Sequence, residues 1–107
     1  MPPVFSTRFL LLPTQQGTYG VPAGHIAVVR CITVWNTSAT ATGWVTVAVN
    51  TSTQILSASL PTNTRVAAEN HAIVWDVRIV LAAAETFTIL RSSADVHAQA
   101  SGYLFPA

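Results

Sequence analysis

Charge is scarce in this chain of 107 residues. Only 8% of its residues are Asp, Glu, Lys or Arg, whereas an ordinary globular domain carries about 25%. Lysine is missing, and five arginines and four acids are scattered along the sequence for a formal net charge of +1. Without a basic stripe, the sequence does not predict nucleic-acid binding. Because so small a net charge gives little repulsion between free molecules, we expect a partner to cover part of the surface.

Cysteine and long apolar runs are equally scarce. The single Cys31 excludes an internal disulfide, and its place within an apolar stretch predicts a small buried side chain. No apolar run approaches the roughly 20 residues that span a bilayer, so no membrane segment is predicted. The opening MPPVFSTRFLLLP holds a short apolar run that ends at Pro13, which does not fit an export signal.

Short runs rich in Val, Ile, Thr and aromatic residues alternate with turn residues, and helical periodicity is nearly absent. Such runs at intervals of about eight to twelve residues are typical of an all-β sandwich or barrel. The LAAAET connection that begins at Leu81 fits either one helical turn or a tight turn. We predict strands near residues 4–12, 18–21, 25–36, 43–50, 53–58, 64–68, 72–81, 85–91 and 95–105.

This number of strands predicts an all-β fold. We expect a single-domain antiparallel β-sandwich, with a jelly-roll-like arrangement as the first choice and an immunoglobulin-like one as the second. Residues 1–17 are expected to form an N-terminal arm or edge strand, and residues 18–107 the β-sandwich domain.

The predicted strand 72–81 shows the clearest alternation. Every second residue from Ile73 to Leu81 is apolar and is expected to face the core, while Asp76 and Arg78 fall on the opposite face. Three interpretations of Arg78 stay open. One is that it pairs with Asp76 or with an acid on a neighbouring strand. The other two place it in solvent or against another subunit. Its side chain covers apolar surface in solvent, or it forms an ion pair with another subunit, a role that suits the bidentate guanidinium.

The polar residues do not form a recognisable catalytic or metal-binding pattern. Serines, histidines and acids are present, but no nucleophile elbow is found, so no catalytic residue is predicted and the chain is not expected to be an enzyme. Asp95 and His97 share one face of a predicted strand, and His25 and His71 are the other histidines. A third ligand is not visible beside that pair, so no metal and no cofactor are predicted.

The three tryptophans allow several roles. Trp75 shares the predicted core face of its strand, whereas Trp35 and Trp44 flank one loop. Packing in the core or against the loop, anchoring of a protein partner, and a sugar-stacking platform all remain open.

Three stretches resemble small structural proteins of tailed bacteriophages. They are YGVPAGHIAVVRCITVWNTS from Tyr19, with a V-P-A-G turn that leads into a strand, WDVRIVLAAAETFTIL from Trp75, and ADVHAQASGYLF from Ala94, with a closing S-G-Y. The resemblance covers the chain from Tyr19 to Phe105. One departure is Ala84, which stands where the family has a glycine in the turn before the acid.

The resemblance implies a non-enzymatic virion structural protein, chiefly a capsid decoration or cement protein that forms homotrimers and binds the major capsid protein or other virion proteins. It implies a place in the virion, assembled in the host cytoplasm, and no membrane partner. The alternative is a collar-, tail- or fibre-associated module that recognises a glycan or host surface. The N-terminal arm is expected to add a strand to a neighbour. Candidate interface residues are Phe5, Arg8, Phe9, Trp35, Trp44, Arg78 and Tyr103.

Overall fold

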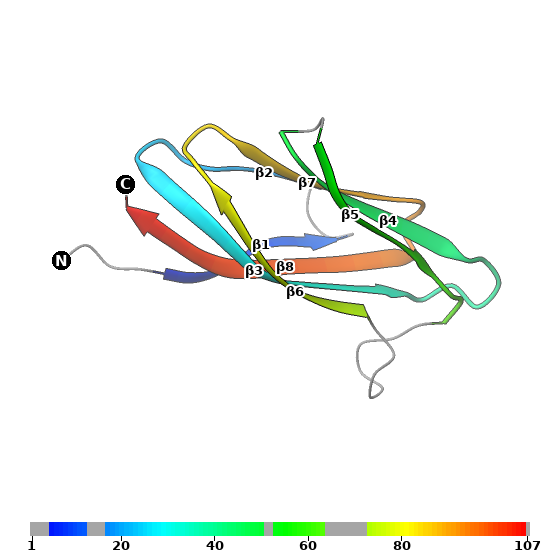
Figure 1. Ribbon diagram of the computed structural model, residues 1–107. Coiled ribbons are helices and arrows are strands. Elements are labelled where there is room, and N and C mark those ends of the chain that lie inside the picture. Colours follow the sequence, from blue (N-terminus) through cyan, green and yellow to red (C-terminus); the bar gives the residue numbers. More distant parts are fainter. Residues whose placement is uncertain (1–4, 13–16, 51–52, 64–72, 107) are drawn as a thin grey trace.

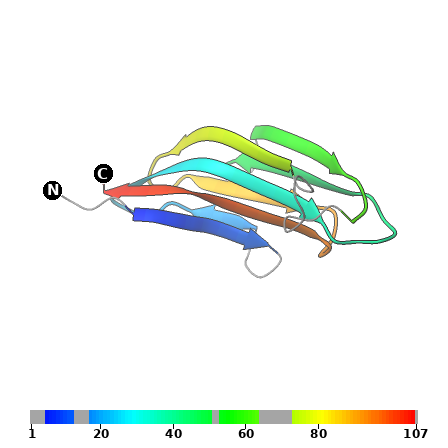
Figure 2. The ribbon, with the colours of Figure 1, turned by 90° about the horizontal axis from the view of Figure 1, so that it is seen from below.

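The computed structural model describes residues 5–12, 17–50, 53–63 and 73–106. These residues form no helix, and therefore no helix that is long and apolar enough to cross a membrane. They form two four-stranded antiparallel sheets packed face to face (Figures 1 and 2). The strands are β1 (Phe5–Leu12), β2 (Thr18–Gly20), β3 (His25–Asn36), β4 (Gly43–Val49), β5 (Thr53–Leu60), β6 (Ile73–Leu81), β7 (Thr86–Arg91) and β8 (Val96–Pro106).

The strand order is that of a jelly roll. Sheet A has the order β1-β8-β3-β6, and sheet B has the order β2-β7-β4-β5. The chain therefore pairs β1 with β8, β2 with β7, β3 with β6 and β4 with β5, as one long antiparallel ribbon. The ribbon wraps until β3 also pairs with β8 and β4 with β7. This confirms the predicted jelly-roll-like sandwich. The immunoglobulin-like alternative is wrong, because that fold distributes its strands differently between the sheets.

The predicted strands agree with the observed ones to within about two residues at each end. The strand expected at 64–68 lies outside the described residues. The connection from Ala82 to Glu85 is a tight turn and not a helical turn. Within the segment expected as an arm or edge strand, β1 forms one edge of sheet A and pairs with β8 of its own chain.

Alternation along each strand builds the core between the sheets. Along β8, for example, Val96, Ala98 and Ala100 are buried, and the residues between them are only partly covered. Burying one large apolar side chain stabilises the fold by about 1.5–3 kcal/mol. The largest fully buried side chains are Phe87, Leu12, Ile32, Leu60, Leu81 and Ile89.

The inward face of β6 was predicted correctly, but most of it is only half-buried. Ile73, Trp75, Val77 and Ile79 are partly exposed, and Leu81 alone is fully buried. The reason is that β6 forms the other edge of sheet A, as β5 forms an edge of sheet B. An inward side chain at an edge has neighbours on fewer sides than one on a central strand.

Two irregularities in sheet A alter the pattern that alternation predicts. The register of β1 against β8 shifts between Arg8 and Leu10, and Phe9 at the shift is buried. A second shift in β3 leaves Arg30 unpaired opposite Gly102 of β8. A β-carbon on Gly102 would collide with the carbonyl oxygen of Val28, so the glycine of the S-G-Y stretch is required for β3 and β8 to approach.

The loop between β3 and β4 is held by a buried asparagine. The Asn36 side-chain amide donates to the carbonyl oxygens of Ala41 (2.9 Å) and Pro61 (3.2 Å), and its Oδ1 accepts from the backbone N–H of Ser38 (3.0 Å). These bonds satisfy a polar group that would be costly to bury alone. They fix the loop in which the chain crosses from sheet A to sheet B.

A polar cluster holds the turn between β6 and β7. The Glu85 carboxylate accepts from the Ala82 backbone N–H (2.7 Å) and from the Asn50 side-chain amide (3.0 Å), and these two bonds lower the pKa of Glu85. Asn50 Oδ1 in turn accepts from the Thr86 backbone N–H (3.0 Å). Ala84, inside this turn, has a φ of 69°, in the left-handed region that disfavours any residue with a β-carbon.

Replacement of Ala84 by glycine is therefore expected to stabilise the protein. Relief of the left-handed strain is worth about 1–2 kcal/mol, less the roughly 0.5–1 kcal/mol of extra freedom that glycine gives the unfolded chain. We expect Ala84→Gly to raise the free energy of unfolding in urea by up to about 1 kcal/mol. Ala83→Gly, at the adjacent turn position, is the matched control and should lower it. A loss of stability in Ala84→Gly would contradict this account.

Candidate functional site

The predicted interface residues do not form one surface. Arg8, Arg78 and Tyr103 are exposed on the outer face of sheet A, and Trp35 lies half-buried on the same face. Trp44 is exposed on the outer face of sheet B.

Phe9 and Phe5 differ from the other predicted interface residues. Phe9 is 5% exposed, and its ring lies 4.8 Å from that of Tyr19, so its prediction as an interface residue is corrected to a core position. The bulge in β1 is the reason, because it turns Phe9 inward. The backbone of Phe5 pairs with Leu104, and its side chain lies outside the described part of the structure.

The tryptophans point away from one another for a topological reason. Trp35 ends β3 in sheet A, and Trp44 begins β4 in sheet B, so their outward faces are on opposite sides of the sandwich. Trp75 is on the inward face of β6 and packs against the core. A platform made of all three tryptophans is therefore excluded.

Trp35 stacks on His97 at one end of the sheet A outer face. The rings lie 5.1 Å apart with an interplanar angle of 17°. The pKa of His97 is lowered, first by burial and then by the positive charge of Arg91, against an opposing effect of Asp95. The imidazole is thus held in its neutral form more strongly than in an unfolded chain.

The two histidines that the structure describes, His25 and His97, do not converge on a metal site. His25 begins β3, whereas His97 pairs with Trp35 near the other end of the same strand. At about 3.3 Å per residue the two imidazoles are on the order of 30 Å apart. His71 lies outside the described residues, and among those described no group of three or more His, Cys, Asp or Glu side chains could hold a metal ion.

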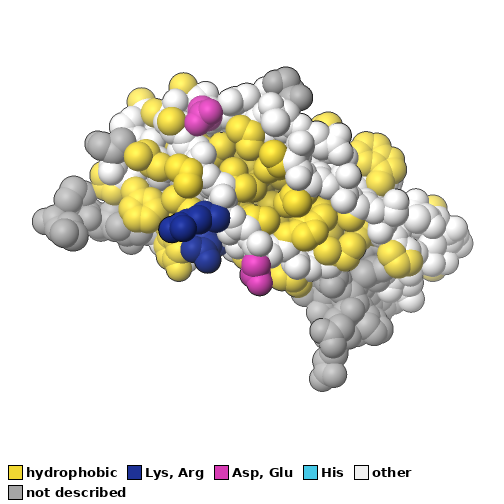
Figure 3. Space-filling model, in the orientation of Figure 1, with side chains coloured by type: hydrophobic (Ala, Val, Ile, Leu, Met, Phe, Trp, Pro, Cys, Tyr) yellow, Lys and Arg dark blue, Asp and Glu magenta, His cyan; other side chains and the backbone are white. Residues whose placement is uncertain are grey.

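The two edge strands β5 and β6 border an apolar groove, which we call the β5–β6 groove. Its volume is about 480 Å³. Figure 3 shows hydrophobic side chains gathered over this edge of the molecule, with basic and acidic side chains beside them. The lining residues are Val49, Ile55, Leu56, Val77, Arg78, Ile79 and Val80.

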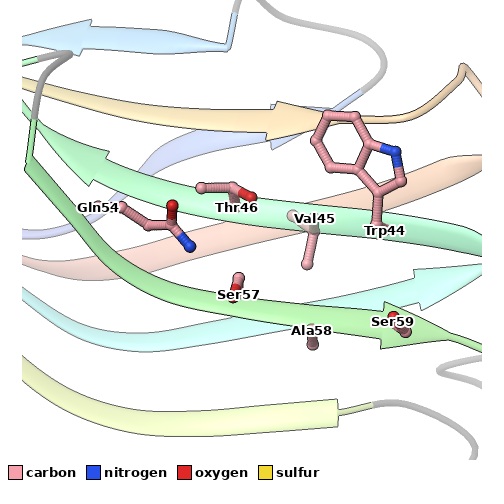
Figure 4. Close-up of a pocket in the computed structure, with 7 residues that line it drawn as sticks. All are labelled: Trp44, Val45, Thr46, Gln54, Ser57, Ala58 and Ser59. Atoms are coloured by element: carbon pink, nitrogen blue, oxygen red, sulfur yellow. The ribbon is translucent and has the colours of Figure 1, made fainter.

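A second, more polar hollow of about 390 Å³ lies over β4 and β5. We call it the Trp44 hollow. Figure 4 shows Trp44 and Gln54 towards its two ends, with Thr46 and Ser57 between them. Its other lining residues are Val45, Ala58 and Ser59.

The predicted interface residues do not include two of the most exposed apolar side chains. Val80 is 61% exposed on β6, and Leu90 is 51% exposed on β7. The signal for Val80 was present, because alternation already put it on the same face as Asp76 and Arg78. Ile55, which is 37% exposed, lies where the register of β4 against β5 shifts.

No known protein family, curated protein or solved structure matches this chain.

The lowered pKa of His97 predicts that stability falls on acidification. The unfolded chain takes up a proton at this histidine near pH 6.5, before the folded protein does. Its contribution is therefore complete above about pH 6.5 and is lost as the pH falls towards the lower folded pKa. The contribution of Glu85, whose pKa is also lowered, is lost only at still lower pH, below the usual glutamate pKa of about 4.3.

We expect the free energy of unfolding of the wild type to decrease from about pH 7.5 to pH 5.5. His97→Phe keeps an aromatic ring against Trp35 but cannot titrate, so its decrease should be smaller. Urea unfolding at a series of pH values measures both slopes, with His25→Gln as the control variant. Equal slopes in His97→Phe and wild type would contradict the assignment.

Proposed function

We propose that this chain is a non-enzymatic structural subunit of a tailed-phage virion, chiefly a capsid decoration protein, and that it associates with copies of itself through the β5–β6 groove. The β5–β6 groove is the observation that supports the proposed self-association. The virion role itself rests on the family resemblance of the three sequence stretches, and the jelly roll, which occurs in viral capsid proteins, is compatible with it as an analogy of fold.

The groove has the character of a protein interface. Six of its seven lining residues are aliphatic, and all of these except Val49, which ends β4, come from the edge strands β5 and β6. Contiguous apolar surface of this kind marks protein contacts in soluble proteins, and each Å² removed from water contributes about 25 cal/mol. The chain has few charges that could keep free molecules apart. Sister copies that cover the groove therefore shield the apolar surface that is most prone to nonspecific association.

Charged side chains beside the groove support contact with a second copy. Asp76 and Arg78 are exposed on β6, two residues apart, and neither has an ion-pair partner among the residues that the structure describes. Side chains of opposite sign on one edge allow Arg78 of one copy to meet Asp76 of the next in a symmetric assembly. An arginine suits such a partly buried, bidentate pair.

The oligomer is expected to be a trimer, as the family resemblance implies. Native mass spectrometry and sedimentation at several concentrations measure its mass. A negative charge in the groove should dissociate it, because the carboxylate would be desolvated without a partner. We therefore expect Val80→Asp and Ile55→Asp to shift the protein from trimer to monomer.

Leu90→Asp is the matched control, because Leu90 is comparably exposed but lies on β7, outside the groove. It should leave the oligomer intact. A wild-type protein that stays monomeric at high concentration would overturn the assembly, and an equal effect of Leu90→Asp would overturn its assignment to the groove. The copy number in purified phage particles that contain this chain tests the decoration role: many copies per head support it, and a few copies at the tail contradict it.

A further inference from the structure

The geometry points to the Trp44 hollow as a binding site for a neutral carbohydrate. This inference goes beyond the assembly role. It does not depend on that role, because the hollow lies over β4 and β5 on the outer face of sheet B, whereas β6 forms the far side of the β5–β6 groove. It is carried by an exposed aromatic ring, a row of polar side chains without partners, and an absence of charge along the lining.

Trp44 supplies a flat apolar surface at a fixed place. Its side chain is 48% exposed, although tryptophan is usually largely covered in folded proteins. Both polar groups of its backbone are held by Ser92, since the Trp44 N–H donates to Ser92 Oγ (3.1 Å) and its carbonyl accepts from the Ser92 N–H (3.1 Å). With the backbone held, binding has only the two side-chain torsions of Trp44 to order, and the π-face of the indole suits the apolar C–H face of a pyranose.

Polar side chains continue from the ring along the two strands. Trp44 pairs with Ser59, and Thr46 with Ser57, so these side chains share the outer face of the sheet. Gln54 follows on β5. Outward positions repeat about every 7 Å along a strand and about 5 Å across strands, which is the scale of a sugar ring and its hydroxyl groups.

These groups are free to bind a ligand. Within the described part of the chain, no hydrogen bond involves the side-chain polar atoms of Thr46, Gln54, Ser57 or Ser59 or the Trp44 indole. Hydroxyl and carboxamide groups both donate and accept, so together they match the mixed donors and acceptors of a saccharide. The hollow, at about 390 Å³, falls within the roughly 300–1,000 Å³ of small-molecule sites.

The charge distribution selects a neutral ligand. No charged residue lines the Trp44 hollow, and Arg91 is the only Asp, Glu, Lys or Arg in the strands of sheet B. Phosphate groups, acidic sugars and nucleic acids would find no cation there to offset their desolvation. A neutral oligosaccharide needs only the hydroxyl and amide groups that the hollow offers.

Titrations of ¹⁵N-labelled protein test this site directly. The probes are neutral trisaccharides of glucose, galactose, mannose and N-acetylglucosamine, with trigalacturonate as an acidic control. We expect at least one neutral trisaccharide to shift the Trp44 indole N–H signal, which Trp44→Phe identifies by its loss. A dissociation constant on the order of 1 mM, the weak end of specific binding, is expected for one shallow site.

Single substitutions distinguish sugar binding at the Trp44 hollow from nonspecific binding elsewhere. Trp44→Ala should weaken binding at least about tenfold, and Gln54→Ala should weaken it less. Tyr103→Ala removes an exposed aromatic ring from sheet A and should leave binding unchanged. The dispersion of the amide spectrum shows that each variant is folded.

Three results would overturn the inference: no shift with any neutral trisaccharide, binding that survives Trp44→Ala, or equal binding of trigalacturonate. Titration of the Val80→Asp variant, which is expected to be monomeric, tests sugar binding independently of assembly. Sugar binding by a monomeric variant supports the site whether or not the wild type assembles through its groove.

Discussion

The structure depends on the burial of one face of each sheet against the other. Four antiparallel strand pairs form a ribbon, and the ribbon buries its apolar faces only when it wraps so that β3 meets β8 and β4 meets β7. The inward positions of the central strands are therefore mostly apolar, and the buried Asn36 at the end of β3 is hydrogen-bonded. The charged side chains that the structure describes lie on the outer faces, at strand ends and in the turns, where water or a partner solvates them.

The two open sides of the sandwich differ in how well their apolar side chains are covered. On the side of β1 and β2, the bulge in β1 turns Phe9 inward against Tyr19, and the resulting burial raises the pKa of the Tyr19 hydroxyl. On the side of β5 and β6, the inward side chains Val77 and Ile79 remain half-exposed beside a groove. The same physical requirement, cover for apolar atoms, is met within the chain on one side, and on the other side the proposed contact with a second copy would meet it.

The two sheets also differ in the chemistry of their outer faces. Sheet A presents Arg8, Asp76 and Arg78 among apolar side chains, whereas the strands of sheet B carry hydroxyl groups, an amide and one exposed tryptophan. A surface with charges of both signs suits a protein partner that pairs them, and a neutral hydroxyl-rich surface suits a sugar. The proposed assembly and the inferred ligand thus use separate parts of a small domain.

Strand positions, inward faces and the sandwich class were determined by the sequence, because alternation with a period of two is a local property of each segment. The departure from glycine at Ala84 likewise marked a turn that the structure shows to have a positive φ. Only the tertiary structure decided which strands became edges, and therefore why Val77 is half-exposed. It also decided that a bulge buries Phe9 and that Trp35 and Trp44 lie on opposite sheets. These outcomes depend on the pairing of segments far apart in the chain, which no local pattern encodes.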